Sequence, residues 1–159
     1  MMMRWTAILC ASCLALIACR EQAPSVAAQG PADHEVVFTS PGGDARLLVR
    51  VADSDVERAS GLMWVQELAE DQGMAFVFEE PTDQGFWMKN TLIPLSIAFV
   101  DHAGTIVTIR EMEPCETPTC PMYWPDAPFV LAVEANAGWF DGAGVAEGDR
   151  ALLVAAIDG

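Results

Sequence analysis

The sequence is poor in basic residues and in histidine. Among 159 residues, Lys and Arg number 8 against 23 Asp and Glu, which gives a formal net charge of −15. Such an acidic chain repels phosphate backbones, so we expect no nucleic acid as a partner. The two histidines, His34 and His102, stand at the end of a tether-like segment and in a DHAG turn. Neither position favours the buried histidine of a catalytic triad.

The signatures of several enzyme classes are also missing. The chain contains no GxSxG, no HExxH, no Walker loop and no glycine pattern of a dinucleotide-binding fold. Acidic pairs such as Glu79-Glu80 occur, but with 23 acids chance proximity is expected, and no EF-hand spacing is present. These absences favour a non-catalytic protein with no metal or other cofactor. A small hydrolase or other envelope enzyme acting on a polar or carbohydrate substrate is the alternative.

The N-terminus has the pattern of an export signal. Arg4 precedes an apolar run over residues 5–18, which is too short for a membrane span and has the length of a signal-peptide core. Residues 16–19, LIAC, resemble the bacterial lipoprotein box, in which the Cys is lipidated and becomes the new N-terminus. We therefore expect a signal peptide over residues 1–18 and a lipid on Cys19 that holds the exported chain to a membrane. An ordinary secretory signal or a short uncleaved anchor is the alternative.

The next residues separate this anchor from the folded part. Residues 20–33, REQAPSVAAQGPAD, show no periodicity and contain two prolines, so we expect a flexible tether over residues 19–33. The remaining residues, 34–159, have the length of a single domain. The anchored domain would face the periplasm of the bacterial envelope. Arg20 directly after the Cys favours the outer membrane, by resemblance to enteric sorting rules.

Two cysteines remain in the domain, Cys115 and Cys120, within the proline-rich segment EPCETPTCPMYWP. In an oxidising compartment such a pair forms a structural disulfide that closes a small loop. A redox-active pair or a soft metal site are the alternatives. A redox motif has two intervening residues and a helix N-terminus, and zinc would need two further ligands. The structural disulfide is the interpretation that we favour.

The sequence pattern of the domain predicts a β-rich α+β fold. A capping-box pattern of Ser54 and Glu57 opens a short helix that ends near Ser60, and residues 137–144 suit one helical turn. Curling of a mostly antiparallel sheet toward a barrel would limit its exposed edges. The predicted strands cover residues 34–40, 45–52, 73–80, 86–90, 94–101, 105–113 and 129–136, with a last strand after the turn at 147–149.

Several motifs occur in one order along the chain: RASGLM (58–63), GMAFVFEEP (73–81), FWMKNTLIPLSIAFVD (86–101), the proline-rich loop and VLAVEANAG…GVAEGD (130–149). Together they resemble the prokaryotic family called domain of unknown function 192, over roughly residues 35–157. The resemblance implies a compact, often exported β-rich domain and brings no established activity. After WMKNT the family typically has Pro-Leu-Asp, whereas this chain has Ser96, so a carboxylate is missing there.

The stretch WMKNT, residues 87–91, places polar groups directly before an apolar strand. Because side chains alternate along a strand, we expect Trp87, Lys89 and Thr91 on one side and the residues between them on the other. Glu134 lies in an otherwise apolar strand and needs a partner if it is buried. In a structural hypothesis, Arg58 or Lys89 pairs with Glu134. Asn90 and Thr91 then hydrogen-bond the turn before Pro94.

In a binding hypothesis, Trp87 supplies a flat apolar face and the neighbouring polar groups supply contacts to a sugar or another small polar ligand of the envelope. Its predicted site consists of Trp87, Lys89, Asn90, Arg58 and Glu134. Scattered methionines, each within an apolar run, suit core filling better than copper binding. We therefore expect a lipid-anchored binding or assembly module of the cell envelope.

Overall fold

The structure, a computed structural model, describes residues 32–155. The predicted signal peptide, the predicted lipid site at Cys19 and most of the predicted tether lie outside the described residues. Within residues 32–155, no helix has the length and hydrophobicity that crossing a membrane requires.

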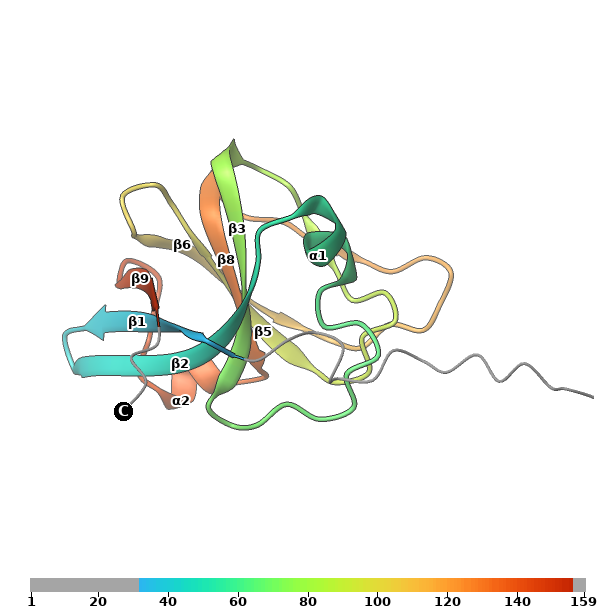
Figure 1. The fold of residues 1–159 in the computed structure, drawn as a ribbon, viewed down its shortest axis with the longest axis horizontal. Coiled ribbons are helices and arrows are strands. Elements are labelled where there is room, and N and C mark those ends of the chain that lie inside the picture. Colours follow the sequence, from blue (N-terminus) through green and yellow to red (C-terminus); the bar gives the residue numbers. More distant parts are fainter. Residues whose placement is uncertain (1–31, 156–159) are drawn as a thin grey trace, which may run out of the picture.

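A seven-stranded sheet dominates the domain (Figure 1). Its spatial order is β6-β5-β8-β3-β2-β1-β9, and all neighbours are antiparallel except β2 and β3, which are parallel. The strands are β1 His34–Ser40, β2 Gly43–Ala52, β3 Gln72–Thr82, β5 Leu95–Val100, β6 Ile106–Met112, β8 Phe129–Asn136 and β9 Arg150–Ala155. The prediction of a β-rich, mostly antiparallel fold is confirmed.

The sheet curls until its two edge strands meet at one end. Thr105, just before β6, forms an isolated antiparallel bridge with Arg150, the first residue of β9. The Ile106 N–H donates to the Asp149 carbonyl at 2.9 Å, next to this bridge. The edges are thereby partly paired, which limits the exposed backbone that an open sheet would present.

Two short helices and a small second sheet complete the domain. Helix α1, Asp55–Ser60, begins at Ser54 with the predicted capping box, in which Ser54 and Glu57 each accept a backbone N–H of the other. Helix α2, Trp139–Gly142, follows β8. The small sheet pairs β4, Phe86–Trp87, with β7, Met122–Tyr123.

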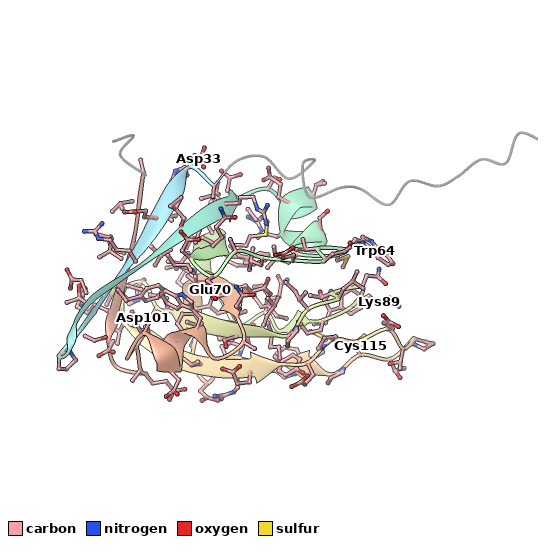
Figure 2. All side chains as sticks on the ribbon, turned by 90° about the horizontal axis from the view of Figure 1, so that it is seen from below. Asp33, Trp64, Glu70, Lys89, Asp101 and Cys115 are labelled. Atoms are coloured by element: carbon pink, nitrogen blue, oxygen red, sulfur yellow. A yellow bond between two sulfur atoms is a disulfide. The ribbon has the colours of Figure 1, made fainter. Side chains whose placement is uncertain are left out.

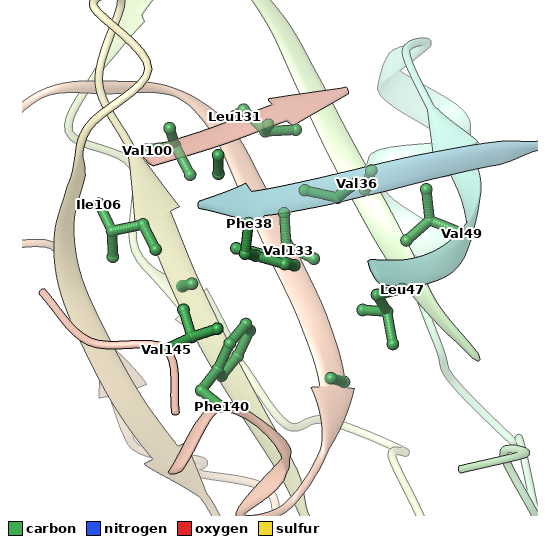
Figure 3. Close-up of a cluster of buried hydrophobic side chains, with 14 residues drawn as sticks. Val36, Phe38, Leu47, Val49, Val100, Ile106, Leu131, Val133, Phe140 and Val145 are labelled. Atoms are coloured by element: carbon green, nitrogen blue, oxygen red, sulfur yellow. The ribbon is translucent and has the colours of Figure 1, made fainter. Parts of the chain in front are cut away.

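The inner face of the curled sheet encloses one hydrophobic core (Figure 3). Val36 and Phe38 of β1 pack there with Val133 of β8. Phe140 of α2 packs edge-on against Phe38, with ring centroids 5.6 Å apart. Burial of these apolar side chains supplies the main favourable term for folding.

A second core lies on the outer face of the central strands. Side chains alternate, so Ala75 of β3 belongs to the inner core while Met74 and Phe76 belong to the outer one. The outer core is covered by the segment after α1, through Leu62 and its neighbours. Met74, Met88 and Met112 are buried in this core, as the core-filling interpretation predicts.

Cys115 and Cys120 form the predicted disulfide, with their Cα atoms 5.8 Å apart. The bond closes the loop that leads directly into β7. The predicted strand over residues 86–90 is shorter than expected, because β4 ends at Trp87. Asn90 has a left-handed backbone with φ of 58°, and the Thr91 N–H donates to the Met88 carbonyl, so the chain turns there.

Candidate ligand-binding site

An open groove of about 550 Å³ lies beside α1 and the small sheet. Three large apolar side chains that line it are solvent-exposed: Trp87 by 50%, Met122 by 41% and Trp124 by 57%. The pairing of Trp87 with Met122 across β4 and β7 brings two of them together. Exposed apolar groups gathered in one hollow indicate a binding surface rather than scattered surface residues. The lining consists of Arg58, Ala59, Phe78, Gln84, Gly85, Phe86, Trp87, Met122 and Trp124.

A small cavity of about 30 Å³ adjoins the groove. The two hollows share Arg58, Ala59, Phe86 and Trp87 in their linings, so they lie next to each other. Two buried polar side chains, Thr91 and Glu134, also line the cavity. The complete lining is Arg58, Ala59, Ser60, Gly61, Leu62, Met63, Phe76, Phe86, Trp87, Thr91 and Glu134.

Glu134 is the most unusual residue of this site. Val133 and Ala135 of β8 belong to the inner core, so strand alternation places Glu134 on the outer face, where only 5% of it is exposed. No side chain among residues 32–155 forms a hydrogen bond or ion pair with its carboxyl. Desolvation by burial raises the pKa of Glu134 to about 8. The carboxyl is therefore mostly protonated at neutral pH.

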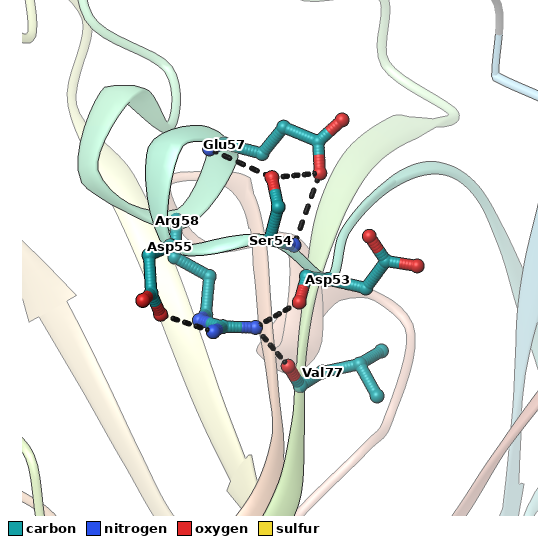
Figure 4. Close-up of polar contacts among 6 residues, drawn as sticks. All are labelled: Asp53, Ser54, Asp55, Glu57, Arg58 and Val77. Carbon is teal, nitrogen blue, oxygen red and sulfur yellow. Dashed lines mark hydrogen bonds and ion pairs between the residues drawn. The ribbon is translucent and has the colours of Figure 1, made fainter.

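Arg58 lines the same cavity as Glu134. Its guanidinium is held by other groups (Figure 4). Its Nη2 is 2.6 Å from Oδ1 of Asp55, and its Nη1 donates to the Val77 carbonyl at 2.8 Å and also to the Asp53 carbonyl. The guanidinium also lies 5.0 Å from the centre of the Phe78 ring, a cation–π distance. The ion pair between Arg58 and Glu134 that the structural hypothesis predicted is thus not formed.

Lys89 and Asn90 do not line either hollow. Lys89 forms a parallel bridge with Cys115, and the Asn90 N–H donates to the Cys115 carbonyl at 3.3 Å. The Asn90 carbonyl in turn accepts the Trp64 N–H at 2.8 Å. Lys89, Cys115 and Trp64 lie together at one end of the molecule (Figure 2). The structure therefore brings together Trp87, Arg58 and Glu134, and gives the other two predicted residues a place in a backbone junction.

Sequence reasoning missed several residues of the site. Met122 and Trp124 follow the disulfide loop, and only the pairing of β7 with β4 brings them to Trp87. Arg50, which lines neither hollow, was also missed: it is buried, and its Nε and Nη2 atoms have no hydrogen-bond partner. Strand register places Arg50 opposite Met74 and Met74 opposite Glu134, so all three share the outer face. The signal that could have linked them is an arginine and a glutamate, each flanked by apolar residues in its strand.

Ser96, where the related pattern has Asp, has a structural role. Its Oγ donates to Oε1 of Glu111 at 2.7 Å and accepts the Gly138 N–H at 2.8 Å. Gly138 precedes α2, so this contact fixes the turn between β8 and the helix. Ser96 is fully buried and lies outside the groove and the cavity.

Other features of residues 32–155 offer weaker candidates. A shallow hollow of about 650 Å³ lies near Trp139 and Arg46, and another of about 560 Å³ lies near His102. Neither contains a buried carboxyl. Across the described part of the chain, no group of three or more His, Cys, Asp or Glu is arranged to hold a metal ion.

Comparison with known proteins identifies the same family as the motifs of the sequence do. A profile of the DUF192 family, described as Uncharacterized ACR, COG1430, matches residues 36–153. The chain belongs to the DUF192 family. This confirms the predicted family, whose description names no activity. No curated protein matches the chain.

Solved structures of two bacterial proteins share the fold. A protein of unknown function from Novosphingobium aromaticivorans DSM 12444 is 29% identical, with a TM-score of 0.69 over 74% of this chain and 83% of that chain. A protein from Sinorhizobium meliloti 1021, named as a candidate transcription regulator, is 33% identical. Its TM-score is 0.68 over 78% of this chain and 94% of that chain.

Proposed function

We propose that this DUF192 protein is a non-catalytic binding module that holds a small polar ligand, such as a sugar of the cell envelope, in the groove beside Trp87. One observation carries the proposal. An open groove with exposed indoles adjoins a cavity with a buried carboxyl that has no side-chain partner. Leaving such a group unpaired is unfavourable, and a bound ligand can supply the missing partner.

The chemistry of the lining suits a sugar. Trp87 and Trp124 offer flat apolar faces of the kind that pack against pyranose rings, and both are half-exposed in the free protein. Gln84 and Thr91 add an amide and a hydroxyl, and Glu134 adds a carboxyl deeper in the site. A mostly apolar hollow with a few converging polar groups is typical of small-molecule sites.

Lipidation of Cys19 would hold this module on the periplasmic side of an envelope membrane. The support is the sequence alone: a short apolar run, a LIAC box and a proline-containing tether. Replacement of Cys19 by Ser is expected to abolish metabolic labelling with palmitate. Labelling equal to that of the wild type would refute the anchor.

A hydrolytic function receives less support from the site. Glycoside hydrolysis uses two carboxyl groups on either side of the bond that is cleaved. Among the described residues that line the groove and the cavity, Glu134 is the only acid. Binding without chemistry is therefore the function that we propose.

A thermal-shift screen of the purified protein with glucose, N-acetylglucosamine, glucosamine and peptidoglycan fragments tests this function. We expect at least one compound to raise the melting temperature, and Trp87→Ala to remove that shift. Leu152→Ala is the matched control, because Leu152 is 64% exposed and lies outside the groove. No shift with any compound, or an equal shift in Trp87→Ala, would contradict the proposal.

A further inference from the structure

We infer that the cavity at Glu134 receives a protonated amine, so that the ligand is a small organic cation such as an amino sugar. This inference rests on the proposed function and narrows its ligand class. Three observations support the inference. Glu134 is a buried carboxyl without a side-chain partner, aromatic rings line the cavity around it, and the cavity admits only one small group.

The size of the cavity limits what can reach Glu134. A volume of about 30 Å³ holds a group the size of one water molecule or one ammonium, whereas a sugar ring is several times larger. The ring of a ligand must therefore stay in the groove of about 550 Å³, against Trp87 and Trp124. Only a substituent of that ring enters the cavity.

The charges around Glu134 leave room for a cation. Arg58 is paired with Asp55 and donates to the backbone carbonyls of Asp53 and Val77. Arg50 lies two strands away on the same face, roughly 10 Å between Cα atoms from the strand spacing, and makes no ion pair with Glu134. Arg110, beyond Ile97 on the other side, is paired with Asp126 and Glu147. None of these three arginines thus forms an ion pair with the Glu134 carboxyl.

The aromatic lining of the cavity and the negative charge of the protein both favour binding of a positively charged group. The rings of Phe76, Phe86 and Trp87 line the cavity, and aromatic faces attract an ammonium ion. A neutral hydroxyl would gain less from these walls and from the carboxyl, since hydrogen bonds between charged groups are about twice as strong as neutral ones. The net charge of −15 raises the local concentration of cations near the site.

Binding of an amine changes the proton balance in a defined way. Burial holds the pKa of Glu134 near 8, so the empty site carries a carboxylic acid at pH 7. An ammonium beside it stabilises the carboxylate. The carboxyl proton then leaves to solvent, and this release is largest at pH values between the lowered pKa of the complex and about 8. Above about pH 9 the carboxyl is already ionised, and the release disappears.

Carbon-13 NMR of the purified protein measures this directly. The Glu134 carboxyl resonance is identified as the one missing from Glu134→Gln, and its titration midpoint is recorded with and without methylammonium chloride. We expect methylammonium to lower the midpoint by about one pH unit or more, and sodium chloride at equal ionic strength to leave it unchanged. A midpoint that methylammonium does not move overturns the inference. The wild-type titration remains decisive if Glu134→Gln does not fold, because Thr91→Val then serves to assign the resonance through its shift.

A second arm separates the inference from the proposed function. Glucosamine and glucose share a ring and differ at one amino group, so their affinities are compared in wild type and in Glu134→Gln. We expect glucosamine to bind roughly tenfold more tightly than glucose, and the variant to remove this preference. Equal affinities that depend on Trp87 would overturn the inference and keep the function. A methylammonium effect without any sugar binding would overturn the sugar class and keep the inference.

Discussion

Glu134 of β8 and Trp87 of β4 line the same small cavity, although they come from different sheets and lie far apart in the sequence. Strand alternation turns Glu134 to the outer face of the large sheet. The pairing of β4 with β7 holds Trp87 above that face. The relationship joins a buried acid to an exposed aromatic groove, and the proposed binding function depends on it.

The first prediction concerns the pH dependence of stability. Burial raises the folded-state pKa of Glu134 from 4.5 to about 8, so the folded protein holds this proton more tightly than the unfolded chain does. The stabilisation is fully present below about pH 4.5 and is lost as the pH rises through about 8. Urea unfolding should therefore show wild type losing a few kcal/mol relative to Glu134→Gln across this range.

The exposed acid Glu67 provides the control for this experiment. Glu67→Gln removes a negative charge from the surface and should leave the shape of the pH profile as in wild type. If the free energy of unfolding changes with pH in the same way in wild type and in Glu134→Gln, Glu134 ionises normally in the folded protein.

The second prediction concerns Ser96. Ser96→Ala removes the hydroxyl that links Glu111 to the Gly138 N–H, and should reduce the free energy of unfolding by about 1–2 kcal/mol. Ser96→Asp introduces the residue of the related pattern but places a second carboxyl beside Glu111. Repulsion should make it less stable than Ser96→Ala at neutral pH, with partial recovery near pH 4. A Ser96→Asp variant as stable as wild type at pH 7 would refute this account of the site.

The third prediction concerns the disulfide. Replacing both Cys115 and Cys120 by Ser should reduce stability by about 2 kcal/mol, because the bond closes a short loop in the unfolded chain. Since β7 begins two residues after Cys120, the same variant should bind groove ligands more weakly. Wild type treated with dithiothreitol should reproduce both changes. Unchanged ligand affinity after reduction would show that the loop does not position the groove wall.

The fourth prediction concerns Gly85 at the floor of the groove. A Cβ there would lie 2.9 Å from Trp124 Cε3 and 3.0 Å from Met122 Cε, so Gly85→Ala must displace these exposed side chains. We expect weaker ligand binding with little change in melting temperature, because the displaced groups face solvent. Gly142→Ala is the matched control, since nothing lies within 4 Å of its Cβ. Equal ligand affinity in the two variants would argue against a role for Trp124.

Much of the fold follows from local patterns, whereas the site depends on long-range pairing. Ser54 and Glu57 form the predicted capping box, and alternation identifies the strands of the large sheet. Lys89 was predicted as a site residue from strand alternation alone. The hydrophobic pattern does not reveal the left-handed turn at Asn90, where the alternation ends. The partners of Arg58 were also missed. Backbone carbonyls such as that of Val77 become acceptors only when α1 packs beside β3.

The most direct test of the central claim is a crystal structure of the protein soaked with glucosamine. We expect the sugar ring to lie against Trp87 in the groove, with its amino nitrogen about 3 Å from a carboxyl oxygen of Glu134. A sugar bound in the hollow near Trp139 instead, or with its amino group turned away from Glu134 toward solvent, would contradict it.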